Sequence, residues 1–202
     1  MTSAQRFIKR SFDILFSAVG LVVLGWLIVP AIIGARIDTE QSGIFRQRRV
    51  GLNGRLFNIM KIRTMRDSNR ISTVVTTADD PRITRFGRVL RRTKLDELPQ
   101  LFNILRGDMS FVGPRPDVPE YMDRLTGDDR LILSVRPGIT GPATIKYRND
   151  EQLLAGQQNP LRYNDEVIFP DKVRINSRYV ENYSFSTDLR YIWVTLFSRA
   201  MV

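Results

Sequence analysis

The chain contains no cysteine and no histidine. Without cysteine it can form no disulfide, thiol nucleophile or thiolate metal site, and the sequence carries no sign of an oxidising compartment. Without histidine, an imidazole general base and a His-ligated zinc site are excluded. Any catalytic chemistry must therefore use Asp, Glu, Lys, Tyr, Ser or Thr, and a hard cation such as Mg²⁺ is the metal that suits such groups.

Positive charge is what the chain has in excess. It carries 31 Lys and Arg against 21 Asp and Glu, a net charge of +10 over 202 residues. Such a balance predicts a polyanionic partner: nucleic acid, anionic lipid head groups or a phosphorylated small molecule. The length and the 43% hydrophobic content fit one globular domain with an accessory segment.

An uncharged, Leu/Val/Ile-rich stretch from Ile14 to Ala35 predicts a membrane segment. A cleaved signal peptide starts similarly, but its apolar core of roughly 7–15 residues is shorter. Pro30 removes a helical hydrogen bond and bends or breaks the helix. The part before it, residues 14–29, extends only about 24 Å at about 1.5 Å per residue, which is less than a hydrocarbon core of about 30 Å.

Basic residues flank this stretch on both sides: Arg6, Lys9 and Arg10 before it, and Arg36, Arg46, Arg48 and Arg49 after it. The positive-inside rule favours keeping both flanks on the cytoplasmic side. A helix-break-helix that enters and leaves one leaflet satisfies both flanks, whereas a straight span satisfies one. We therefore expect residues 1–36 to form a re-entrant membrane helix broken at Pro30, with a simple span as the alternative.

The C-terminal residues 187–200 predict an amphipathic helix. Apolar side chains recur at helical spacing, with Ser186 or Thr187 as the N-cap and Asp188 on the polar face. The apolar residues are Leu189, Ile192, Trp193, Leu196, Phe197 and Ala200. The sequence leaves two interpretations open, a helix packed on the protein's own core and a helix lying in the membrane interface.

Between these ends, Gly51-Leu52-Asn53-Gly54 predicts the turn of a hairpin with strands Ile44 to Val50 and Leu56 to Ile62. The polar residues 69–80 predict an exposed loop. A helix should then open at Asp80-Pro81 and run to about Arg92, with Phe86, Val89 and Leu90 facing inward.

Two adjacent carboxylates, Asp96 and Glu97, follow a run of cations and are called the acid pair below; the cations are Arg82, Arg85, Arg88, Arg91, Arg92 and Lys94. Arginine binds phosphate bidentately, and a neighbouring carboxylate can hold a divalent metal or attack phosphorus. The alternative is a helix terminus that neutralises nearby arginines. We expect Asp96 to cap a helix that tolerates Pro99 and stops at Gly107, so that the helix dipole keeps Asp96 ionised. Adjacent helical residues do not share a face, so the two carboxylates should have different roles.

Other cations are candidates for binding phosphate. Arg115 lies between Pro114 and Pro116, and Arg136 precedes Pro137, so each is presented from a stiff segment. A rigid surface turn is the alternative for both. Lys61, Arg63 and Arg66 follow the second strand, where they are either part of a site or a solvated basic edge.

Taken in order along the chain, these segments resemble the bacterial sugar transferase family, the monotopic phosphoglycosyl transferases that act on polyprenyl phosphate. The matching motifs are Phe45-Arg46-Gln47-Arg48-Arg49-Val50-Gly51, Lys61-Ile62-Arg63-Thr64-Met65, Leu90-Arg91-Arg92-Thr93, Leu95-Asp96-Glu97-Leu98-Pro99-Gln100-Leu101, Gly107-Asp108-Met109-Ser110, Val112-Gly113-Pro114-Arg115-Pro116 and Arg136-Pro137-Gly138-Ile139-Thr140-Gly141. Several are weak alone, but the ordered set is specific and covers nearly the whole chain.

The resemblance implies transfer of sugar-1-phosphate from a nucleotide-diphosphate sugar, usually a UDP-sugar, to undecaprenyl phosphate, with release of UMP. It implies a Mg²⁺-dependent, two-step reaction in which Asp96 becomes a covalent phosphosugar adduct and Glu97 assists with metal binding, proton handling or positioning. By motif position Arg91 and Arg115 are the first phosphate-binding residues, with Lys61, Arg63 and Arg136 next. Direct transfer in a ternary complex, with Asp96 as metal ligand or base, is the alternative mechanism.

The resemblance also implies an α+β, helix-rich fold: the re-entrant helix of residues 1–36, and a catalytic domain of residues 37–202 with the hairpin and interfacial amphipathic helices. It places the enzyme at the cytoplasmic face of the bacterial inner membrane, among anionic lipids, and leaves a homodimer open. Many members have serine before the helix-breaking proline, whereas this chain has Val29. Sugar selectivity is expected in residues 146–180, outside the shared motifs.

Two rival functions follow from the same sequence. The charge suits a membrane-tethered module that binds nucleic acid or regulates, but no RNA-binding aromatic motif or zinc finger is present, and such a module leaves the acid pair unexplained. We therefore expect no nucleic-acid partner. A binding or assembly protein without activity is the other rival, and the intact acid pair with its arginines argues against it.

Overall fold

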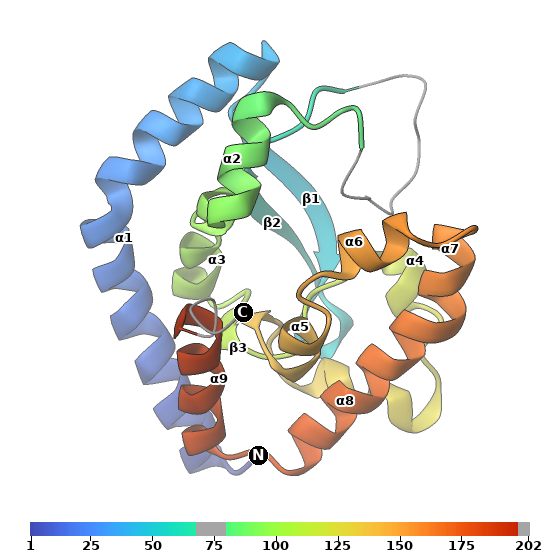
Figure 1. The fold of residues 1–202 in the computed structure, drawn as a ribbon. Helices are drawn as coiled ribbons and strands as arrows, with labels where there is room; N and C mark the ends of the chain where they lie inside the picture. The colour runs from blue at the N-terminus through green and yellow to red at the C-terminus, as the bar shows by residue number, and fades with distance from the viewer. Residues whose placement is uncertain (68–79, 198–202) are drawn as a thin grey trace.

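The computed structural model describes residues 1–67 and 80–197, and within them the chain is a helix-rich α+β protein, as the sequence predicts (Figure 1). Two strand pairs are present there: β1 with β2, antiparallel, and β3 with β4, parallel. The helices are α1 (Ser3–Thr39), α2 (Arg85–Thr93), α3 (Gln100–Arg106), α4 (Pro119–Met122), α5 (Pro142–Lys146), α6 (Asp150–Ala155), α7 (Pro160–Tyr163), α8 (Phe169–Glu181) and α9 (Phe185–Phe197), and the strands are β1 (Ile44–Val50), β2 (Leu56–Ile62), β3 (Ser110–Val112) and β4 (Gly138–Thr140). Short 3₁₀ segments cover Leu52–Gly54, Leu95–Glu97 and Gly127–Ser134, and a π turn covers Asn164–Ile168.

Helix α1 is one continuous helix of 37 residues with Pro30 inside it. The predicted break at Pro30 is therefore wrong, and Figure 1 shows α1 as one curved, unbroken helix. Proline lacks only the hydrogen bond of its own missing N–H, so the helical ladder resumes after it. Thr2 starts the helix with a capping box, in which its hydroxyl accepts from Gln5 N and the Gln5 side chain accepts from Thr2 N. In the described part of the chain, α1 is the helix long and apolar enough to cross a membrane.

The first turns of α1 are held by polar contacts. Lys9, 8% exposed, forms an ion pair with Asp188 of α9, which also accepts a hydrogen bond of 2.7 Å from the Tyr179 hydroxyl. Arg10 donates to the carbonyls of Ile104 and Leu105 at 2.6 and 2.8 Å, in the last turn of α3, where orphan carbonyls favour a cation. The two ends of the described chain are thus joined, and Figure 1 shows α9 beside the first half of α1.

The C-terminal part of α1 packs on the rest of the protein, whereas the middle of the helix exposes apolar side chains. Ala31 and Ala35 pack against Ile62 of β2 and Leu90 of α2, because their small side chains allow close approach. Between the two attached ends, Val22 is 82% exposed and Trp26 71% exposed. A contiguous apolar face of this kind marks contact with a membrane or another apolar partner.

The predicted hairpin is confirmed with the same strand bounds. Ile44 pairs with Ile62 and Val50 with Leu56 across the antiparallel ladder. Asn53 in the turn adopts φ 54°, a left-handed conformation that asparagine tolerates. Ile59 of β2 packs in a core cluster with Leu101, Ile104 and Met109, which fixes β2 against α3.

Helix α2 begins later than the sequence predicts. It starts at Arg85, where the Thr84 hydroxyl caps it by accepting from Gly87 N at 2.8 Å. Asp80 instead accepts hydrogen bonds from Arg82 and forms a turn, and so the predicted start at Asp80-Pro81 is wrong. Leu90 is buried as expected, but Val89 is 56% exposed and not inward. The loop predicted over residues 69–80 lies, except for Asp80, outside the described residues.

Helix α9 covers Phe185–Phe197, so its predicted start is wrong by two residues, and the predicted end near 200 lies outside the described residues. Ser184, rather than Ser186 or Thr187, caps it by accepting from Thr187 N at 3.2 Å. Asp188, expected on the polar face, is 2% exposed because it pairs with Lys9. Packing on the protein's own core is confirmed for part of this helix, and the membrane-interface interpretation stays a prediction. Tyr191 and Ile192 pack on the core, whereas Leu189, Trp193, Leu196 and Phe197 are exposed.

Candidate active site

The acid pair lies in a tight connection between α2 and α3. Helix α2 ends at Lys94 in a left-handed conformation of φ 61°, and Leu95–Glu97 form one 3₁₀ turn. Pro99 occupies the cap position of α3, and so the prediction that Asp96 caps this helix is wrong. Gly107 ends α3 with φ 94°, as predicted for a helix stop.

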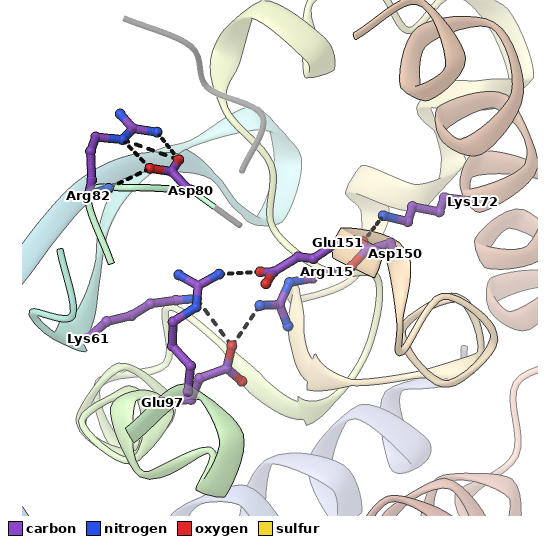
Figure 2. A network of polar contacts seen from close by, with 9 residues as sticks. Lys61, Asp80, Arg82, Glu97, Arg115, Asp150, Glu151 and Lys172 are labelled. Atoms are coloured by element: carbon purple, nitrogen blue, oxygen red, sulfur yellow. Dashed lines mark hydrogen bonds and ion pairs between the residues drawn. The ribbon is translucent and has the colours of Figure 1, made fainter. Parts of the chain in front are cut away.

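Glu97 is held by two cations from distant parts of the chain (Figure 2). Its Oε1 accepts from Lys61 Nζ of β2 at 3.1 Å and from Arg115 Nη2 of the proline-flanked loop at 2.6 Å. Burial opposes its ionisation, but the positive charge of Arg115 and Lys61 outweighs burial and holds the pKa of Glu97 well below its usual range. Conversely, the Glu97 carboxylate raises the pKa of the Arg115 guanidinium. These contacts favour the ionised form of Glu97 and hold its side chain in place.

Asp96 has the opposite environment. It is 7% exposed, and its Oδ1 has no hydrogen-bond partner among the described residues. Burial raises the pKa of Asp96, although Lys61 opposes the rise. The expectation that a helix dipole keeps Asp96 firmly ionised is therefore wrong, because Asp96 does not sit at the α3 N-terminus. The two adjacent carboxylates thus have different environments: Glu97 pairs with two cations, whereas Asp96 has an oxygen without a hydrogen-bond partner among the described residues. Their different roles stay a prediction.

Arg91 forms an ion pair with Glu151 of α6 and lies close enough to Asp96 to lower the pKa of that carboxyl against the effect of burial. The neighbouring Asp150 pairs with Lys172 of α8 at 2.9 Å, and Figure 2 shows both α6 carboxylates beside the acid pair's cations. Asp150 and Glu151 are not among the site residues predicted from the sequence. Their sequence signal is weak, because adjacent acidic residues also occur at Asp79-Asp80, Asp128-Asp129 and Asp165-Glu166.

Two predicted phosphate-binding residues face other groups. Arg63 donates to the Ser42 carbonyl at 2.8 Å and pairs with Asp67 at 3.3 Å. Arg136 donates to the Gly107 carbonyl at 2.8 Å, at the end of α3 where Arg10 also binds. Of the seven predicted site residues, the structure thus brings together five, Lys61, Arg91, Asp96, Glu97 and Arg115.

The acid pair is also the predicted Mg²⁺ site. The described residues contain no group of three or more carboxylates that could hold a metal alone. Mg²⁺, however, commonly binds through one or two carboxylates together with substrate phosphates. The unpartnered Oδ1 of Asp96 fits such a ligand, whereas Glu97 is already engaged by Lys61 and Arg115. The residues present therefore fit a metal that the substrate helps to hold, with Asp96 as the main protein ligand.

Comparison with known proteins gives one consistent answer. The model of the family described as bacterial sugar transferase matches residues 4–201. The exopolysaccharide production protein ExoY of Sinorhizobium fredii is 34% identical over 204 residues, which cover 93% of this chain and 83% of the relative. The undecaprenyl-phosphate galactose phosphotransferase of Salmonella typhimurium is 34% identical (95% of this chain, 40% of the relative), and the undecaprenyl-phosphate glucose phosphotransferase of Komagataeibacter xylinus is 35% identical (93% and 35%). The chain thus spans most of the shorter relative and well under half of the two longer ones.

Proposed function

Because the chain belongs to the bacterial sugar transferase family, we propose that it transfers sugar-1-phosphate from a nucleotide-diphosphate sugar to undecaprenyl phosphate. Relatives named as undecaprenyl-phosphate sugar phosphotransferases support this reaction class, that of a phosphoglycosyl transferase. The observation that carries the proposal is the buried Asp96, with one oxygen unpartnered, beside Lys61, Arg91 and Arg115. This arrangement suits attack on a phosphorus atom whose negative charge the cations offset.

In the first step, Asp96 attacks the β-phosphorus of a UDP-sugar. A bond forms between the carboxylate oxygen and phosphorus, the bond from that phosphorus to the bridging oxygen breaks, and UMP leaves with the bridging oxygen and its electrons. Arg91 and Arg115 are the cations proposed to bind the phosphates and to offset charge that develops on the leaving oxygen. Glu97 has a positioning role, because it fixes the Lys61 and Arg115 side chains at the edge of the site.

In the second step, a phosphate oxygen of undecaprenyl phosphate attacks the same phosphorus. The bond between phosphorus and Asp96 breaks and returns its electron pair to the carboxylate, so the enzyme is regenerated and the lipid carries a diphosphate-linked sugar. Mg²⁺, held by Asp96 and the substrate phosphates, supplies further charge neutralisation when bound. We also propose that the site faces the cytoplasm. The nucleotide sugar is dissolved there, and the phosphate of the acceptor lipid lies at the adjacent head-group plane.

UMP release from protein in nanodiscs with undecaprenyl phosphate, Mg²⁺ and a panel of UDP-sugars tests the proposal. One donor should give lipid-dependent UMP release, which Asp96→Asn should reduce by at least 10³-fold, on the order of the loss of a nucleophile. Asp128→Asn, the same change at an exposed residue, is the matched control and should retain activity. Appreciable turnover by Asp96→Asn would refute the nucleophile role.

Direct transfer in a ternary complex is the second candidate mechanism, because a buried carboxylate with a free oxygen is also suited to bind metal or act as a base. The two mechanisms differ when the acceptor lipid is omitted. The two-step mechanism releases about one UMP per site and leaves the β-phosphorus label on the protein, and Asp96→Asn abolishes both signals. Direct transfer gives neither signal until undecaprenyl phosphate is added.

A further inference from the structure

Two arginines separate two acid pairs in this site. Arg115 pairs with Glu97 of the first acid pair. The negative charge of Glu97 is the largest cause that raises the pKa of Arg115, and the charge of Asp150 on α6 adds to it. Arg91 pairs with Glu151 of α6 and lies within electrostatic range of Asp96. The proposed phosphate-binding cations are therefore paired with carboxylates, and a bound anion must compete with those carboxylates for them.

The carboxylates differ in how tightly they are held. The Glu97 side chain is 12% exposed and is held by two cations, whereas Glu151 is 42% exposed and pairs with Arg91. A partly exposed ion pair is weak, so its partner exchanges easily. Breaking the contacts of a buried carboxylate between two cations is much more costly. Glu151 is thus the partner that a competing anion displaces.

Helix α6 stays anchored when Glu151 is released. Asp150 pairs with Lys172 of α8, and Leu154 is 4% exposed against the core. Both contacts are independent of Arg91. Exchange therefore requires a rotation of the Glu151 side chain, not unfolding of α6, and the carboxylate stays close enough to return when the anion leaves.

We propose that Glu151 occupies, on Arg91, the position that a phosphate of the diphosphate donor takes when it binds, so that donor binding exchanges a carboxylate for a phosphate. The identification of the ligand as a donor diphosphate rests on the proposed function; the competition on Arg91 does not. Glu151 sets the affinity of the site for anions and promotes their release after reaction.

Glu151→Gln tests this exchange, because it keeps the shape of the side chain and removes its charge. The probe is inorganic pyrophosphate at fixed Mg²⁺, titrated by calorimetry into the full chain in nanodiscs. The variant should bind pyrophosphate about fivefold more tightly, the equilibrium equivalent of a partly exposed ion pair. Glu151→Ala should behave in the same way.

Glu166→Gln is the matched control. It makes the same charge change at the exposed Arg162–Glu166 pair, and it should leave pyrophosphate affinity within twofold of wild type. A general gain in positive charge would strengthen binding in both variants and would overturn the proposal. The double variant Arg91→Ala/Glu151→Gln should bind no more tightly than Arg91→Ala alone, because the site of competition is gone.

Unchanged affinity in Glu151→Gln would overturn the proposal, since the ion pair would then be a surface contact without competition. Weaker binding would also overturn it, since Glu151 would then contact the anion or hold Arg91 in place for it. Because the assay measures binding without turnover, tighter pyrophosphate binding together with no UMP release from any donor would retain the exchange and reject the proposed reaction.

Discussion

At the scale of single residues, the pKa of a buried carboxyl depends on the cations that contact it in the fold rather than on its neighbours in the sequence. Asp96 and Glu97 are adjacent, yet burial raises the pKa of one while Arg115 and Lys61 overcome burial and lower the pKa of the other. The pair could be predicted from the sequence, because two carboxylates after a run of cations are conspicuous. The choice of partners could not, since Lys61 and Arg115 reach Glu97 from positions 36 and 18 residues away.

Replacing Lys61 tests how much the stability and activity of the site depend on the contact between Lys61 and Glu97. Lys61→Gln leaves the buried Glu97 with Arg115 as its remaining ion-pair partner, and we expect a loss of about 1.5–3 kcal/mol in the free energy of unfolding, the range for hydrogen bonds to charged groups. Donor turnover should fall as well. Chemical denaturation measures the first effect. Lys94→Gln, at an exposed position, is the control, and an equal loss there would contradict the role of this contact.

Asp171 should make the fold sensitive to acid. Hydrogen bonds from Lys146, then Tyr147 and Arg174, hold the pKa of Asp171 well below its usual range. A lowered folded-state pKa stabilises the protein above the ordinary carboxyl pKa, and the contribution disappears as the pH falls from there through the folded-state pKa. Asp171→Asn should therefore lower the melting temperature at pH 7 and converge with wild type in strong acid. A constant difference across that range would contradict the assignment.

At the scale of elements, turn residues predict the bounds of the hairpin well. The start of a helix is predicted poorly where two residues could each cap it. The hairpin bounds follow from Gly51-Leu52-Asn53-Gly54, because a turn at that point fixes the register of both strands. The start of α2 was missed because Asp80 and Thr84 are both good caps, and Asp80 instead binds Arg82. That choice depends on tertiary contacts which the local sequence does not contain.

Gly87 is the point at which α2 can approach the chain after β2. A Cβ atom placed there would lie 2.0 Å from the Thr64 carbonyl oxygen, so backbone must shift to admit it. Gly87→Ala should therefore destabilise the protein and, by moving Arg91 on the same helix, lower turnover. Gly25→Ala, where a Cβ meets no atom within 4 Å, is the control and should be neutral or slightly stabilising. Thermal melting and UMP release report the two effects, and equal behaviour of the variants would refute close packing as the cause.

At the scale of the whole molecule, the membrane topology of α1 can be tested by cysteine labelling. The chain has no cysteine, so an introduced cysteine is the only one that a thiol reagent labels. Single cysteines at the exposed positions Ala4→Cys and Arg55→Cys flank the apolar part of α1. In a re-entrant arrangement, a membrane-impermeant thiol reagent labels both only after the cytoplasmic face is opened. Labelling of Ala4→Cys from outside intact cells would establish a simple span instead.

Pro30 supplies the matching variant for the same assay. Because proline lacks an N–H and bends a helix, Pro30→Ala restores the missing hydrogen bond and favours a straighter helix. We expect a fraction of the Ala4→Cys/Pro30→Ala protein to become accessible from outside. Unchanged labelling would mean that the Lys9 and Arg10 contacts, rather than Pro30, set the arrangement.

The ion pair between Lys9 and Asp188 links the order of synthesis to the completion of the fold. Its partners are 179 residues apart, so the ribosome makes Lys9 roughly 10–35 s before Asp188 at about 5–20 residues per second. During that interval α1 lacks the contact that later fixes its first turns. Lys9, which is buried in the completed fold, is still in contact with water. Helix α1 is thus synthesised well before its partner, and α9, the final helix of the described residues, supplies the contact that holds the first turns of α1.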